Sequence, residues 1–268
     1  KRLFVWPRGG STAGMSVLGE ALAPLQLTIT AASVATWFVV QHRLVPALLA
    51  WRFGPELWRT RGEDVQRQCR ISVTSGLFSL LAVCIGSLGL LLPGPAVAAD
   101  PVYGRSDALQ HAFAVVAGFF AWNSIADIFA GAAVANRVHH LCCMVIYLVV
   151  QTPFCPRIGC ILMLFEASTP SLVTFNVLRM FDLADSRQYR TQRAAFAVLF
   201  ILVRMVIGIP LTIGWYFDMF ALLSDKSREV HSMLIVRATM VAPVLFYAVN
   251  FHWLALIVRG LVQKSRPR

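Results

Sequence analysis

Long apolar runs follow one another along the chain and are separated by short polar segments that contain arginine. Asp, Glu, Lys and Arg are all absent from residues 21–41, 71–99, 112–126 and 194–203. A helix needs about 20 mostly apolar residues to cross the hydrocarbon core of a bilayer. The pattern therefore predicts about seven spanning helices, at roughly residues 21–40, 71–92, 109–134, 138–153, 158–178, 194–216 and 233–258.

The fourth predicted helix is the shortest of the set. Pro153 and Pro156 end it, and Arg157 follows directly. Proline stops a helix because it lacks the amide hydrogen and clashes with the preceding turn. A tilted or partly interfacial helix is therefore an alternative to a full span at this point.

Composition places the chain in a membrane. Apolar residues make up 57% of it and charged residues 14%, and its mean hydropathy is +0.67. Soluble domains contain about 25% charged residues, so a water-soluble globule is excluded. We expect an all-α fold, a multi-pass transmembrane helical bundle. A short N-terminal segment, residues 1–20, precedes one domain, residues 21–258, and a basic tail follows, residues 259–268.

The chain has 24 basic and 13 acidic residues, which gives a net charge of +11. No basic arm, aromatic strip or finger spacing accompanies the charge, so we expect no nucleic acid partner. The segments after the first, third, fifth and seventh predicted helices contain 15 basic residues, and those on the opposite side contain 7. Basic loops stay on the cytoplasmic or matrix side, which predicts that the C-terminus lies there.

Two features bear on location. The start KRLFVWPRGG is compatible with the mature end left by a mitochondrial presequence, and equally with a partial chain. We expect the mitochondrial inner membrane or the endoplasmic reticulum. The segment Trp51–Arg70 mixes tryptophan with arginine, which suits a helix in the headgroup zone with Trp51 and Trp58 at the interface. An ordinary loop is the alternative.

Ionisable residues inside the apolar runs are costly, so each needs a partner or a purpose. Asp127 lies near the end of the third run, and His139 and His140 open the fourth after an expected tight turn at Asn136 and Arg137. A hairpin would bring this carboxylate close to the imidazoles. The three residues are catalytic candidates, because a carboxylate beside an imidazole favours a general base for acyl transfer. A buried structural contact is the alternative, and no ligand spacing calls for a metal.

The run FEASTPSL in the fifth helix places Glu166, Thr169 and Pro170 on one face. Pro170 cannot donate to the carbonyl of Glu166, which loosens the helix and leaves an acceptor facing the bundle. Arg204 in the sixth helix is a candidate for an ion pair with Glu166. These four residues are candidates for lipid contact or for structural polar roles within the bundle.

Several stretches, in this order, resemble the TLC family. This is the multi-span lipid domain that TRAM proteins, Lag-type ceramide synthases and several lipid-regulating membrane proteins share. The resemblance covers roughly residues 50–216 and is closest to the smaller, non-ceramide-synthase branch. It rests on WRTRGEDVQRQCRISVTS, ADPVYGRSD, FFAWNSIADIFAG, VHHLCCMVIYLVV, LFEASTPSLVTFNVLRMF and LFILVRMVIGIPL.

The resemblance implies six or seven helices around a lipid or acyl-chain cavity that the paired histidines and the aspartate face. In ceramide synthases the matching residues serve acyl-CoA-dependent acylation of a sphingoid base, and His139, His140 and Asp127 inherit that candidate role. This chain departs from the pattern. Many members have a histidine shortly after the arginine that opens the second span, whereas this chain has RISVTSG, with Ser75 and Gly76. The longer ceramide-synthase motif is also missing.

Three functions are open from the sequence. The first is a non-catalytic accessory subunit that binds membrane lipid and packs against protein partners, with no cofactor besides the lipid. The second is an acyl-CoA-dependent lipid N-acyltransferase that uses His139, His140 and Asp127. The third is a sensor, regulator or transporter of membrane lipid. The missing histidine favours the first.

Overall fold

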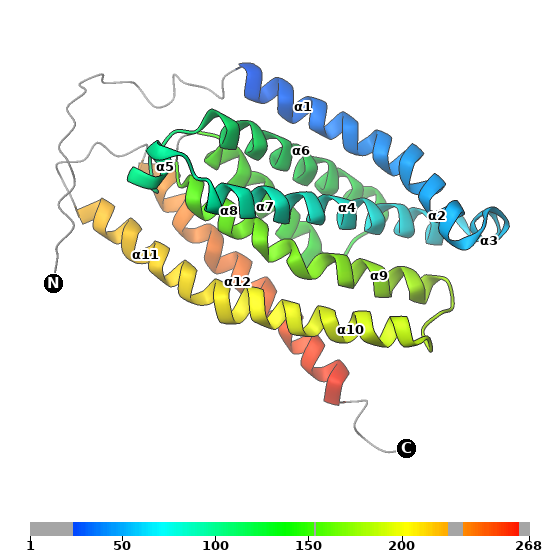
Figure 1. Cartoon of the computed structure of the whole chain (residues 1–268). Coiled ribbons are helices and arrows are strands. Elements are labelled where there is room, and N and C mark those ends of the chain that lie inside the picture. The colour runs from blue at the N-terminus through cyan, green and yellow to red at the C-terminus, as the bar shows by residue number, and fades with distance from the viewer. Residues whose placement is uncertain (1–23, 153, 225–232, 263–268) are drawn as a thin grey trace.

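The chain folds into long helices that run back and forth along one direction (Figure 1). The computed structural model describes residues 24–152, 154–224 and 233–262. Every regular element within these ranges is helical. The all-α, multi-pass membrane fold is confirmed.

The described helices join end to end into seven rods. Short helices α3 (Pro55–Arg59) and α5 (Pro95–Ala99) lie in the connections. The rods are α1 (Pro24–Val39) with the π-helical η1 (Val40–Leu44) and α2 (Val45–Phe53); α4 (Glu63–Leu91); α6 (Asp107–Ala130); α7 (Val134–Val150); α8 (Pro156–Leu164) with the 3-10 segment η2 (Phe165–Ser168) and α9 (Thr169–Met180); α10 (Arg187–Phe200) with the π-helical η3 (Ile201–Ile207) and α11 (Gly208–Ser224); and α12 (Met233–Val262).

Each predicted apolar run coincides with one rod. Within the described ranges, five helices are long and apolar enough to cross a membrane: 63–91, 107–130, 156–180, 187–224 and 235–260. α7 has 17 residues, which agrees with its expected shortness, and α1 has 16 residues before the π-helical segment. The count of seven spans stays a prediction.

Six of the rods close into a ring. α4 packs on α6, α6 on α7, α7 on α12, α12 on α11, α10 on α9, and α8 and α9 return to α4. The first rod lies outside this ring and packs chiefly through α1 on α6. The ring places α7, which carries the histidine pair, between α6 and α12.

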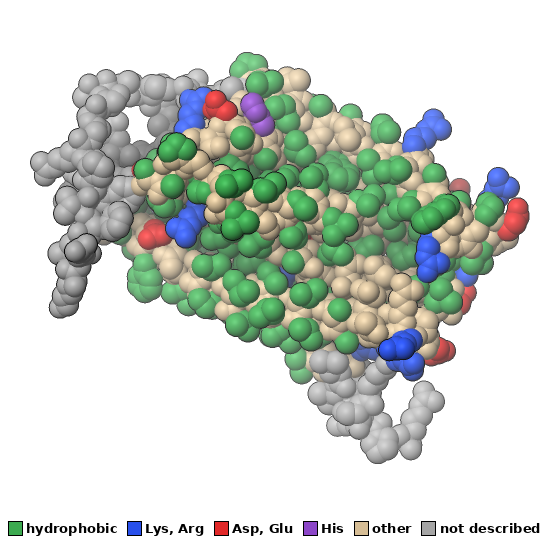
Figure 2. Space-filling view, in the orientation of Figure 1, with side chains coloured by type: hydrophobic (Ala, Val, Ile, Leu, Met, Phe, Trp, Pro, Cys, Tyr) green, Lys and Arg blue, Asp and Glu red, His purple; other side chains and the backbone are tan. Residues whose placement is uncertain are grey.

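The surface has the polarity that a bilayer requires. In Figure 2 hydrophobic side chains cover the middle of the visible face, and the charged side chains gather at its two ends. α1 begins at one of these ends and α12 finishes at the other (Figure 1). An odd number of crossings, as the basic-residue bias predicted, gives this arrangement.

Local signals fix several helix ends. The Ser106 hydroxyl accepts from the backbone N–H of Leu109 and caps α6, and Ser186 caps α10 in the same way. Gly131 has φ 62° and ends α6, which allows the chain to turn at once into α7. The turn therefore holds the ends of α6 and α7 close together.

The two tryptophans expected at the interface have different environments. Trp51 exposes 81% of its surface at the end of α2, as an interfacial side chain would. Trp58 exposes 7% and packs in a cluster with Leu49, Cys69 and Phe181. Trp58 therefore faces the protein, because α3 folds back, and its position at the interface stays a prediction.

Small residues allow the rods to approach closely. A Cβ built on Gly86 of α4 would lie 2.6 Å from the carbonyl oxygen of Cys160, and one on Gly118 of α6 would lie 2.5 Å from that of Thr30. Close backbone approach is how helices pack in lipid, where the hydrophobic effect does not drive their association. The α4–α8 and α1–α6 contacts thus depend on glycine.

We expect Gly86→Ala to separate α4 from α8, because the added methyl group meets backbone atoms that cannot move aside. The loss should be about 1–3 kcal/mol of unfolding free energy, the usual scale for overpacking, measured by denaturation in detergent micelles. Gly214→Ala in α11 is the control, since no atom lies within 4 Å of its added Cβ. Equal stabilities of the two variants would contradict the close approach of α4 and α8 at Gly86.

Candidate functional site

The hairpin of α6 and α7 brings Asp127 and His140 into direct contact. His140 Nδ1 lies 2.6 Å from Asp127 Oδ2. On its other side, Nε2 of the same ring lies 3.0 Å from Nδ2 of Asn123, which precedes Asp127 by one helical turn. The carboxylate and the imidazole are largely buried, with 6% and 18% of their side chains exposed. The three side chains form one hydrogen-bonded chain across the two helices.

Protein groups occupy both nitrogens of the His140 ring. Nδ1 lies beside the carboxylate of Asp127, and Nε2 lies beside the side-chain amide of Asn123. In this arrangement neither ring nitrogen of His140 is left without a protein partner.

His139 points into an aromatic enclosure. It is 6% exposed, and its ring centroid lies 5.3 Å from that of Phe246 and 5.1 Å from that of Trp253, both in α12. Cys143 Sγ lies 3.9 Å from each ring nitrogen. The neighbours of His139 are packing partners, and they join α7 to α12.

A second polar cluster joins the fifth, sixth and seventh rods around Arg204. Its guanidinium donates from Nε to the carbonyl of Phe165 at 3.1 Å and from Nη1 to Asn250 Oδ1 at 2.9 Å. Nη2 lies 3.9 Å from Glu166 Oε1. The predicted ion pair is therefore present, although the closer partners of Arg204 are the carbonyl and the amide. Thr169 donates its hydroxyl to the other carboxylate oxygen of Glu166 at 2.7 Å.

Irregular helix turns create this cluster. Pro170 interrupts the hydrogen bonding before it, and Phe165–Ser168 becomes the 3-10 segment η2. The carbonyl that faces the bundle belongs to Phe165, whereas that of Glu166 accepts from the backbone N–H of Thr169. The prediction that the Glu166 carbonyl faces the bundle was thus wrong by one residue. Arg204 lies within the π-helical segment η3, a wide turn that is frequent at polar sites inside helices.

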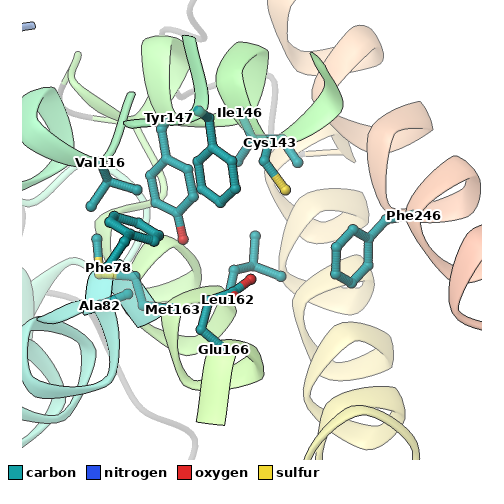
Figure 3. Close-up of a pocket in the computed structure, with 11 residues that line it drawn as sticks. Phe78, Ala82, Val116, Cys143, Ile146, Tyr147, Leu162, Met163, Glu166 and Phe246 are labelled. Atoms are coloured by element: carbon teal, nitrogen blue, oxygen red, sulfur yellow. The ribbon is translucent and has the colours of Figure 1, made fainter. Parts of the chain in front are cut away.

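The ring encloses a cavity beside these clusters, lined from α4, α6, α7, α8 and α12 (Figure 3). Its volume is about 10 Å³, room for roughly one water molecule. Glu166 and Cys143 line it among aromatic and aliphatic groups, but neither His139, His140 nor Asp127 does. The expectation that the histidine pair borders an acyl-chain cavity does not hold for this space, because aromatic rings such as Tyr147 fill the interior.

Comparison with known proteins identifies the fold. The TLC domain model matches residues 68–259 of the chain, which is most of its length. The chain belongs to the TLC domain family. No curated protein and no solved structure matches it.

Two hydrogen-bond partners of the candidate residues in this TLC domain were not predicted from the sequence. Asn123 could have been found, since it lies four residues before Asp127 on the same helical face. Asn250 is a polar residue within the seventh apolar run and could have been matched with Arg204. Among the described residues, no group of three His, Cys, Asp or Glu side chains is placed to hold a metal.

The contact between Asp127 and His140 should be measurable as a coupling. Asp127→Ala and His140→Ala each leave a buried partner unpaired, which costs about 1–3 kcal/mol of unfolding free energy. In the double variant the two losses should not add, and the coupling should be about 0.5–3 kcal/mol. Denaturation in micelles measures all four proteins. Additive losses would contradict the contact, and Asp107→Ala is the control because its side chain is 72% exposed.

Proposed function

We propose that this TLC domain protein is a lipid-associated accessory subunit of a larger membrane assembly and does not catalyse acyl transfer. We also propose that it belongs to the smaller, non-ceramide-synthase branch of the family. The observation that carries the proposal is the occupation of both ring nitrogens of His140, by Asp127 and by Asn123. A general base for acyl transfer needs a free lone pair within reach of the proton that it removes.

The surroundings of the histidine pair support the same function. An acyl-CoA-dependent enzyme must bring the thioester carbon and the acceptor nitrogen together at the catalytic base. His139 and Asp127 expose 6% and 4% of their surfaces, and the neighbouring cavity holds about 10 Å³. The polar core formed by Asn123, Asp127, His139 and His140 is suited to holding α6, α7 and α12 in one arrangement.

Location and orientation form part of the proposal. We place the protein in the mitochondrial inner membrane or the endoplasmic reticulum, with its C-terminus on the matrix or cytoplasmic side. The support is the bias of basic residues toward the loops that share the C-terminal side, among them Arg59, Arg61, Arg179 and Arg187. Membrane lipids and neighbouring subunits are the proposed partners.

Removal of the histidine pair separates the accessory role from catalysis. The purified chain should transfer no acyl group from acyl-CoA to a sphingoid base. His139→Ala combined with His140→Ala should leave any lipid-forming activity of the surrounding membrane fraction unchanged and should lower the midpoint of thermal unfolding. His42→Ala is the control, since His42 is exposed on the first rod. An acyltransferase would behave oppositely: the wild-type chain would turn over, and the folded double variant would be about 100-fold slower or worse.

Thiol labelling tests the orientation. Arg59 and Asp107 are exposed near opposite ends of the bundle. In sealed microsomes of the endoplasmic reticulum, a membrane-impermeant maleimide should label Arg59→Cys and spare Asp107→Cys until detergent is added. In mitoplasts, whose interior is the matrix, the two variants should exchange these results. Labelling of Asp107→Cys in microsomes, or of Arg59→Cys in mitoplasts, would show that the orientation is the opposite of the proposed one.

A further inference from the structure

A lateral groove lies on the outside of the ring, where α2 faces α4 and α9. Its volume is about 300 Å³, whereas the two interior cavities described between the rods have about 10 and 20 Å³. Small-molecule sites have volumes of roughly 300–1,000 Å³, so the groove has the size of a binding site. It does not include the histidine pair or the Arg204 cluster.

The walls of the groove are aliphatic. Leu48 of α2 and Leu80 of α4 stand on opposite sides and are exposed by 37% and 54%. Val173 of α9 and Gly76 of α4 also line it, and a Cβ built on Gly76 would lie 3.1 Å from Val173 Cγ1. The groove extends along α4 from Val73 to Leu80, a rise of about 10 Å. An apolar groove of this length suits part of a hydrocarbon chain.

One end of the groove is polar and cationic. Trp51, 81% exposed, and Arg52 border it at the end of α2, and Gln188 of α10 lies across from them. The Arg52 guanidinium lies 5.1 Å from the centroid of the Phe53 ring. Among the described residues that line the groove, none is acidic. Tryptophan marks the headgroup level of a bilayer, and arginine at this level binds phosphate.

Size and charge select the occupant. A helix with its side chains is about 10–12 Å wide, which a groove of this volume cannot admit. A single acyl chain can enter it from the surrounding bilayer. A zwitterionic headgroup would bring an ammonium beside Arg52 with no carboxylate among the lining residues to receive it. An anionic headgroup has no such cost.

We propose that the groove between α2, α4 and α9 binds an anionic glycerophospholipid, with one acyl chain against Leu48, Leu80 and Val173 and the phosphate at Arg52. This inference rests on the lipid association in the proposed function and gives it a place and a chemical class. The site lies outside the ring and thus away from the polar core.

Native mass spectrometry of the full chain in detergent tests the headgroup. Phosphatidylglycerol and phosphatidylcholine with identical chains are titrated separately. Phosphatidylglycerol should bind more tightly than phosphatidylcholine. Arg52→Gln should lower the affinity for phosphatidylglycerol about fivefold, the scale of one basic residue near a membrane surface. Arg43→Gln is the control, because Arg43 is exposed on the same rod and does not line the groove. Equal binding of the two lipids, unchanged in Arg52→Gln, would overturn the anionic preference.

Bulky substitutions that fill the groove test whether the lipid binds there. Leu80→Trp should lower the binding of both lipids at least tenfold, whereas Leu88→Trp, on the same helix and 58% exposed, should not. Leu48→Trp fills the groove from the opposite wall and gives the same test if Leu80→Trp fails to fold. Wild-type binding in folded Leu80→Trp and Leu48→Trp would overturn the groove and leave lipid association standing. A wild-type chain that binds neither lipid would overturn both proposals.

Discussion

The bundle depends on the constraint that a polar group inside a bilayer must find its partner within the protein. Arg204 is the clearest case, because this residue is 4% exposed and lies amid apolar helices. A carbonyl, an amide and a carboxylate from two other rods surround it. The aromatic rings of Phe200 and Trp253 lie 5.2 and 5.6 Å away and offer cation–π contact. One side chain thereby ties three rods together.

The same constraint explains why protein neighbours surround the histidine pair. Asp127 is buried between α6 and α7, and its carboxylate is hydrogen-bonded to the imidazole of His140. The amide of Asn123 then holds the far side of the ring. Family resemblance locates these residues but does not determine whether a substrate can reach them. The aromatic neighbours of His139 and the small volume of the adjacent cavity give the polar core a structural character.

The helices and the hairpin contact were predictable, and the lateral relations between helices were not. Apolar runs set the rods, and the tight turn expected after the third run brings Asp127 near His140. The turn lies at Gly131, however, and not at Asn136 and Arg137, which belong to α7. The burial of Trp58 and the use of the Phe165 carbonyl depend on how helices rotate about their axes. A short fold-back in α3 and a 3-10 turn at η2 set those rotations. The 3.6-residue periodicity of the sequence does not reveal such local departures from regular α-helix.

The π-helical segment η3 has a consequence for the phase of the sixth rod. A π turn takes in one residue more than an α turn, so the side chains after it are rotated by about 100° relative to those before it. Ile201–Ile207 therefore acts as a phase shift between α10 and α11. A related chain with an unbroken α-helix here would align with this one only across a one-residue gap. Such a chain would have its inward-facing residue at a different position from Arg204.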